Sequence, residues 1–130
     1  ETLHANLGDR YRISPTMAAM VKQGVRNFYV KNDDGSFGAN PAALALIHKG
    51  DSPSTAEQVR SRALTALAVE ARMMLDEGVV STPAEIDLCM LMGAGWPMHL
   101  GGILPYLDRE GISEAACGQR FHAKGVASLP

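Results

Sequence analysis

Few residues of this chain have types and spacing that could do chemistry. One carboxylate, Glu70, lies inside an apolar run, Leu67-Ala68-Val69-Glu70-Ala71. A glycine-rich segment, Gly93-Ala94-Gly95-Trp96-Pro97, invites comparison with loops that cradle phosphates. No spacing typical of metal ligands links the four histidines, His4, His48, His99 and His122. The sequence therefore offers one candidate carboxylate and one candidate loop.

A carboxylate on an apolar helix is costly to bury unless it is paired, hydrogen-bonded or protonated. Glu70 could act as a general base, but the sequence places no candidate acid or nucleophile beside it. We expect Glu70 to accept hydrogen bonds from backbone amides of the loop 93–102, or to pair with an arginine. Either contact would make Glu70 a support for that loop.

The loop itself has the pattern of a structural element. A dinucleotide-binding loop follows a strand and carries a third glycine at the start of the next helix, whereas here an apolar helix comes first. We expect Gly93 to end that helix in the left-handed conformation, and Gly95 to permit a second bend. Trp96-Pro97 would hold the loop against the core, and Gly101-Gly102 would let the backbone approach a neighbouring helix.

The sulfur-containing residues fit a packed interior. We expect the methionines of the second half to pack in the core, with an acyl-chain lining or a docking face as the alternative: Met73, Met74, Met90, Met92 and Met98. Cys89 and Cys117 are too few for a disulfide framework. They indicate free, buried thiols in a reducing cytoplasm, with a reactive or paired thiol as the alternative.

Composition limits the class of protein. The chain has 130 residues, of which 46% are hydrophobic and 5% aromatic, and its formal net charge is −2. Abundant Ala, Leu and Met favour helices packed on helices. The charge disfavours a nucleic-acid partner, and no apolar run is long enough to predict a membrane span.

The elements that position these residues are clearest after residue 53. Ser54 and Glu57 form a predicted capping box for a helix that runs to Glu77, and its apolar middle is typical of a central helix. A second capping box, Thr82 to Glu85, begins a helix that stops at Gly93. Further helices are predicted over 103–109 and over 114–121, the last one capped by Ser113.

The first half is predicted to consist of short pieces. Residues 1–7 resemble the tail of a helix, and Ser14-Pro15 starts another over 16–23. The run 27–30 has extended character and ends at the turn 32–35, but one isolated extended segment predicts no sheet. A short helix is expected over 42–48.

Taken in order, several motifs resemble the C-terminal helical domain of 3-hydroxyacyl-CoA dehydrogenases. The likeness is strongest to the second such domain in multifunctional fatty-acid β-oxidation proteins, such as the α subunit of the bacterial fatty acid oxidation complex. The resemblance is carried by Arg62, Glu70, Asp76-Glu77-Gly78-Val79-Val80, Ser81-Thr82-Pro83, Glu85-Ile86-Asp87, Gly93-Ala94-Gly95-Trp96-Pro97 and Gly101-Gly102.

The chain departs from the family pattern at several positions. Asn27 stands where relatives usually have glycine, and Met98-His99-Leu100 replaces a common Pro-Phe-Arg. Pro105 could shorten the third helix.

The resemblance implies an all-α fold, a small helical bundle of the 6-phosphogluconate/3-hydroxyacyl-CoA dehydrogenase C-terminal-domain type. It also implies a division of the chain. Residues 1–30 would be the tail of a preceding helical domain and a linker. Residues 31–53 would be a linker with a short helix, and residues 54–130 the C-terminal helical dehydrogenase domain.

The functional implications concern a larger parent protein. It would be an NAD-dependent 3-hydroxyacyl-CoA dehydrogenase fused to an enoyl-CoA hydratase, and NAD and the catalytic residues would lie outside this chain. The partners would be upstream Rossmann, helical and hydratase domains, the acyl-CoA substrate and a thiolase subunit. The chain alone would be an inactive scaffold. The alternative is a stand-alone helical binding or dimerisation module without catalytic activity.

Overall fold

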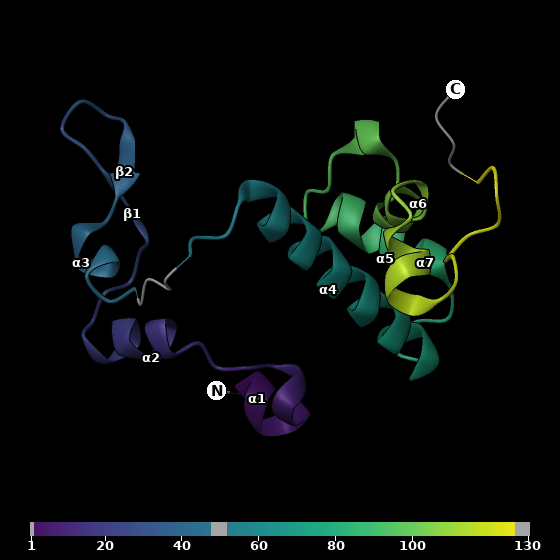
Figure 1. Ribbon diagram of the computed structural model, residues 1–130, viewed down its shortest axis with the longest axis horizontal. Coiled ribbons are helices and arrows are strands. Elements are labelled where there is room, and N and C mark those ends of the chain that lie inside the picture. Colours follow the sequence, from purple (N-terminus) through teal and green to yellow (C-terminus); the bar gives the residue numbers. More distant parts are fainter. Residues whose placement is uncertain (1, 48–51, 127–130) are drawn as a thin grey trace. The chain divides into compact units, whose positions relative to one another are not determined.

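The computed structural model describes residues 2–47 and 52–126 and divides the chain into two compact units, Glu1–Pro53 and Ser54–Pro130 (Figure 1). Helices dominate both units, so the predicted mainly α-helical class is confirmed. The assignment of these units to domains of a larger protein stays a prediction. Among the described residues, none of the helices has the length and apolar character needed to cross a membrane.

The first unit consists of short elements, as the sequence indicates. They are α1 (Thr2–Leu7), η1 (Gly8–Arg10), α2 (Pro15–Lys22), β1 (Tyr29–Lys31), β2 (Phe37–Ala39) and α3 (Pro41–Leu44). Ser14 caps α2 as predicted, since its side chain accepts a hydrogen bond from the Met17 amide. The helix predicted over 42–48 is shorter, because α3 ends at Leu44; His48 lies outside the described residues.

The prediction that the extended run 27–30 forms no sheet is wrong. β1 pairs with β2 in an antiparallel hairpin, with Val30 opposite Gly38. The turn between the strands explains the pairing: Gly35 adopts a positive φ of 85°, and Asp34 accepts hydrogen bonds from both the amide and the hydroxyl of Ser36. Local turn chemistry thus brings a short second strand into register.

Titration of Asp34 should report on this turn. The hydrogen bonds from the Ser36 hydroxyl and amide lower the pKa of Asp34. Because the ionised carboxylate is the acceptor, the bonds are fully formed above the ordinary aspartate pKa and are lost as the pH falls through the lowered value. We expect the Ser36 amide proton resonance to titrate with a midpoint below the ordinary aspartate pKa, and Asp34→Asn to abolish the titration. A midpoint at or above the ordinary value would contradict this reading.

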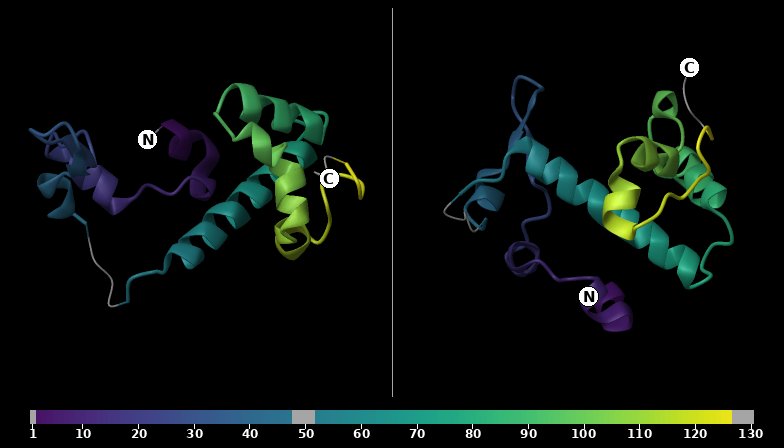
Figure 2. Two further views of the ribbon diagram at one scale, coloured as in Figure 1. Left: turned by 90° about the horizontal axis from the view of Figure 1, so that it is seen from above. Right: turned by 45° about the vertical axis from the view of Figure 1, so that its right-hand side comes forward.

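The second unit packs its helices around one long helix, α4 (Ala56–Asp76). Figure 1 shows α6 and α7 on one side of α4, and Figure 2 gives two further views of the same helices. The remaining elements are α5 (Pro83–Met92), η2 (Met98–Leu100), α6 (Ile103–Arg109) and α7 (Ile112–Cys117). The core consists of apolar side chains from α4, α5, α6 and the segment after α7: Leu64, Ala68, Ala71, Ile86, Ile103, Leu104, Leu107 and Phe121.

The prediction that α4 is a central helix is met only in part, because α4 is buried on one side. Its buried face carries Leu64, Ala68 and Ala71, whereas Leu67 and Val69 are 39% and 41% exposed. The reason is that α6 and α7 cover one side of the helix. The apolar residues on the other side of α4 are therefore left at the surface of the second unit.

The sulfur-containing residues are also less buried than predicted. Met73, Met74 and Met90 are half-buried, but Met92 and Met98 are 74% and 73% exposed. Both thiols are free as expected, with Cys117 half-buried, but Cys89 is exposed. The exposed members lie on α5 or in the loop after it, where the neighbouring helices do not reach.

The helix caps differ from the sequence-based prediction by small shifts. Thr55, not Ser54, caps α4: its hydroxyl accepts a hydrogen bond from the Gln58 amide, and the Gln58 side chain accepts one from the Thr55 amide. Both registers contain a capping pair in the sequence, so the pattern could not select between them. Thr82 makes no side-chain cap; Glu85 instead accepts a hydrogen bond from the Ser81 amide.

The start of α7 is the largest of these corrections. Gly111, in the left-handed conformation, precedes the helix, which spans Ile112–Cys117. Ser113 was expected to be the cap of a helix over 114–121, but it lies inside α7 and is fully buried. Its hydroxyl is used elsewhere, in a hydrogen bond to Asp108.

The cap of α4 can be tested directly. Thr55→Ala removes the hydroxyl that accepts the Gln58 amide and should lower the free energy of unfolding of the second unit by about 1 kcal/mol. Ser54→Ala is the matched control and should change it by less than about 0.5 kcal/mol, because Ser54 is exposed and does not cap the helix. Urea unfolding followed by circular dichroism measures both values. Equal effects of the two substitutions would disprove the assigned register.

Candidate functional site

The loop between α5 and α6 has two turns that depend on glycine. Gly93 ends α5 in a right-handed conformation with φ −106°, so the predicted left-handed end at this residue is wrong. Gly95 takes the left-handed conformation instead, with φ +73°. The reversal is then completed by a hydrogen bond from the Trp96 amide to the carbonyl of Met90. The turn occurs two residues later than predicted because the helix continues its right-handed geometry through Gly93.

Trp96 holds the middle of the loop against the core of the unit. Its ring packs edge-on against Tyr106 of α6, with ring centroids 5.3 Å apart. Arg109 holds the following segment, since its guanidinium donates to the carbonyl of Leu100 at 2.6 Å. Pro97, next to the indole, is exposed. These contacts give the loop a structural anchor on α6.

Gly102 marks the closest approach between the loop and α5. A Cβ atom built on Gly102 would lie 2.5 Å from Cγ of Asp87. Gly101 before it adopts a φ of +75°, a conformation that favours glycine. The pair therefore allows the start of α6 to lie directly against an acidic side chain.

Asp87 is the carboxylate that anchors this end of the loop. It is 9% exposed, and its Oδ1 accepts a hydrogen bond from the Leu104 amide at 2.8 Å. Its Oδ2 lies 2.8 Å from Nε2 of His122. In the sequence, Asp87 stands out only as part of the motif Glu85-Ile86-Asp87. The structure instead gives it a loop-supporting role of the kind predicted for Glu70.

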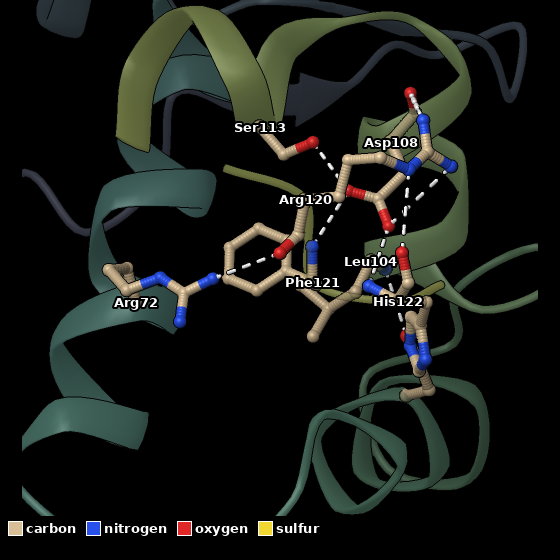
Figure 3. Close-up of polar contacts among 8 residues, drawn as sticks. Arg72, Leu104, Asp108, Ser113, Arg120, Phe121 and His122 are labelled. Carbon is tan, nitrogen blue, oxygen red and sulfur yellow. Dashed lines mark hydrogen bonds and ion pairs between the residues drawn. The ribbon is translucent and has the colours of Figure 1, made fainter. Parts of the chain in front are cut away.

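Asp108 forms the centre of a second buried cluster, shown in Figure 3. The residue is 2% exposed. Its Oδ1 accepts hydrogen bonds from the Ser113 hydroxyl and from the Phe121 amide at 3.0 Å, and its Oδ2 accepts one from the His122 amide at 2.9 Å. Nη2 of Arg120 lies 3.9 Å from Oδ2. One carboxylate of α6 thus satisfies donors from α7 and from the segment after it.

We call residues 118–122 the strap, because this segment joins three helices. Arg120 donates to the carbonyl of Asp108 on α6 at 2.9 Å. Arg72 of α4 donates to the carbonyl of Arg120 and places its guanidinium 4.6 Å from the centre of the Phe121 ring (Figure 3). With the contact of His122 to Asp87 of α5, the strap fixes α4, α5 and α6 relative to one another.

The predicted site residues are therefore only partly brought together. Trp96 and Gly102 contact the core and α5, while Gly93, Gly95 and Pro97 lie exposed in the loop. Glu70 lies half-buried on α4. Its predicted support of the loop stays a prediction.

The arrangement holds segments of the second unit together. The oxygens of Asp87 and Asp108 are occupied by backbone amides and by the strap, so they hold chain segments in place. Among the described residues, no group of three or more His, Cys, Asp or Glu could hold a metal ion. The loop at Gly95 does not fit NAD, because helix α5 precedes it where a dinucleotide site requires a strand.

The sequence-based analysis missed the strap and Asp108. One signal was present: Asp108 directly follows the apolar stretch Ile103-Leu104-Pro105-Tyr106-Leu107, and an acid beside such a stretch is a candidate for burial. No local signal identified the strap, since its contacts join residues separated by 12 to 48 positions.

In a comparison with known proteins, three similar proteins carry the same name. Over 77 residues the chain is 38% identical to the fatty acid oxidation complex subunit alpha of Acinetobacter baylyi, a match that covers 58% of this chain and 11% of the relative. This chain is similar to a part of fatty acid oxidation complex alpha subunits. The alpha subunit of Aliivibrio fischeri is 27% identical over 127 residues, or 93% of this chain and 18% of the relative.

A third alpha subunit, from Acinetobacter baumannii, is 34% identical over 76 residues, covering 57% of this chain and 11% of the relative. The matches thus span less than a fifth of each alpha subunit's length. No protein-family model matches the chain. No solved structure matches it either. The resemblance to alpha subunits of the fatty acid oxidation complex, which the motifs predicted, is confirmed.

Proposed function

We propose that this chain is the non-catalytic C-terminal scaffold of a multifunctional fatty-acid β-oxidation enzyme. The similarity to alpha subunits supports the parent, and the buried carboxylates support the role. The observation that carries the proposal is the use of Asp87 and Asp108. Both carboxylates accept hydrogen bonds from backbone amides of the same unit. These bonds hold the helices in place and occupy the oxygens that would otherwise be available for a reaction.

The parent would combine two activities on coenzyme A thioesters. Its dehydrogenase would oxidise L-3-hydroxyacyl-CoA to 3-ketoacyl-CoA while NAD accepts the hydride, and its hydratase would add water to 2-enoyl-CoA. NAD and substrate would bind in Rossmann, helical and hydratase domains outside this chain, and a thiolase subunit would consume the product. The contribution of this chain would be to shape and support the dehydrogenase domain.

A chimeric alpha subunit tests this role. The segment of the Aliivibrio fischeri subunit that matches 93% of this chain would be replaced by the corresponding segment of this chain. We expect the chimera to keep NAD-dependent oxidation of a 3-hydroxyacyl-CoA, and deletion of the segment to abolish it. The same chimera with Asp108→Ala is the matched control. It should lose the activity because the exchanged segment no longer folds.

Two outcomes would contradict the proposal. A folded chimera with intact Asp108 but no dehydrogenase activity would show that the chain cannot serve as this scaffold. Formation of NADH by the isolated 130-residue chain would show that it is itself catalytic.

The exposed apolar residues favour a second candidate, a helical binding module without an enzymatic parent. Leu88 and Met92 are 61% and 74% exposed and lie four residues apart on α5, so they share one side of that helix. Inactivity of the chimera, together with a stable fold of the isolated chain, would favour this candidate over the scaffold.

A further inference from the structure

Arg72 of α4 is a half-buried cation without a matching anion. Its guanidinium has two contacts within the part of the chain that the structure describes. Nη2 donates to the carbonyl oxygen of Arg120 at 3.4 Å, and Cζ lies 4.6 Å from the centre of the Phe121 ring (Figure 3). Nε is buried and finds no hydrogen-bond acceptor there. No carboxylate of the described residues forms an ion pair with Arg72.

The surroundings of Arg72 make the lack of an anion unfavourable. Residues 70–75 of α4 are all buried or half-buried, so Arg72 lies in the enclosed part of the helix. A charged group that leaves water needs an opposite charge or hydrogen bonds in compensation. One distant carbonyl and one aromatic ring provide only part of it. By contrast Arg60, in the exposed part of α4, has the carboxylates of Glu57 at 3.6 Å and Glu110 at 3.2 Å.

The segment that packs against Arg72 adds to the positive charge. Residues 115–126 include Arg120, His122 and Lys124 but no acidic residue, whereas residues 54–114 have nine acidic and four basic residues. The charge of Arg120 is already balanced, since Asp108 lies 3.9 Å from it. We call Arg72 and residues 115–126 the basic face. It lies on a unit that is otherwise acidic, which favours an acidic partner.

We infer that Arg72 binds a carboxylate of an acidic segment that belongs to the larger subunit and lies outside this chain. The inference rests on the proposed function, because this chain spans less than a fifth of each related alpha subunit. Nη1 of Arg72 is available as the donor, since it makes no hydrogen bond within residues 2–47 and 52–126. A carboxylate fits better than a phosphate, because one guanidinium balances one negative charge and matches the planar carboxylate.

Cross-linking of the chimeric Aliivibrio fischeri subunit tests the contact. Arg72→Lys places an amine at this position, and a water-soluble carbodiimide joins an amine to a neighbouring carboxylate through an amide bond. Mass spectrometry should find position 72 linked to an Asp or Glu outside the exchanged segment. Arg60→Lys is the matched control and should link to Glu57 or Glu110. Links from position 60, with none from position 72 to an acid outside the segment, would overturn the inference.

Charge reversal tests whether the contact supports the strap. In the chimera, Arg72→Glu should raise the rate of thermolysin cleavage within residues 118–126 by about tenfold, and reversal of the linked acid to arginine should restore the rate to within about threefold. A double variant that is cut as fast as the single one would overturn the inference.

Formation of NADH by the chimera is the separate readout of the proposed function. An active chimera without the cross-link would overturn the inference alone. An inactive chimera that forms the cross-link would support the contact and overturn the proposed function.

Discussion

Asp108→Ala should lower the free energy of unfolding of the second unit by about 3 kcal/mol or more. The substitution leaves the buried amide of Phe121 and the half-buried amide of His122 without their acceptor, and an unsatisfied buried donor costs about 1–3 kcal/mol. It also removes the acceptor of the Ser113 hydroxyl and the charge that faces Arg120. Urea unfolding of the chain, followed by circular dichroism, measures the loss.

Ser113→Ala is the control for this prediction. It removes one side-chain hydrogen bond but keeps the carboxylate and its backbone donors, so we expect a loss of about 1 kcal/mol. Protease digestion adds a local readout, because the Asp108 variant should be cut first within residues 118–126. If Asp108→Ala were no more destabilising than Ser113→Ala, the strap would not depend on this carboxylate.

Gly102→Ala should destabilise the same unit by about 2 kcal/mol. The backbone at Gly102 has φ −65° and ψ 157°, which alanine adopts without strain, so the cost is steric. The added methyl group would lie 2.5 Å from Cγ of Asp87. That carboxylate cannot move aside without breaking its contacts with Leu104 and His122.

Gly95→Ala is the comparison for Gly102→Ala. At Gly95 glycine is favoured by the backbone conformation alone and not by a nearby atom. No atom lies within 4 Å of a Cβ built there, but φ is +73°, so we expect a loss of about 1–2 kcal/mol from the left-handed backbone alone. The double variant Gly102→Ala/Asp87→Ala separates the two mechanisms. If the clash with Asp87 is the cause, the double variant will lose less than the sum of the single losses. Simple additivity would contradict that cause.

The sequence is sufficient to predict the helical elements of the second unit, and the physical reason is local. The predicted helix over 103–109 coincides with α6, and the glycine after α4, Gly78, takes a positive φ as a helix stop requires. The cap of α4 was predicted one residue too early, because two neighbouring residues can each cap this helix. Ser54 and Thr55 are both good caps, and only the position of Gln58 in the folded helix selects between them.

The candidate site was predictable in outline and not in its chemistry. The loop between α5 and α6 was identified from its glycines and tryptophan, because these residues signal turns and anchors. Asp87 was not identified as the support of this loop, nor Asp108 as the support of the strap. Their roles come from contacts with Leu104, Phe121 and His122, and such long-range contacts leave no periodic signal in the sequence.

The position of the strap also has a consequence for the order of events during protein synthesis. Asp108 is translated before Phe121 and His122, whose amides satisfy its carboxylate in the native structure. Until the ribosome has released residues 118–122, this carboxylate has no native backbone donors from the strap and is better hydrated than buried. The helices α4 to α6 should therefore stay loosely associated on the nascent chain. They should reach their native packing only when the strap has emerged from the exit tunnel.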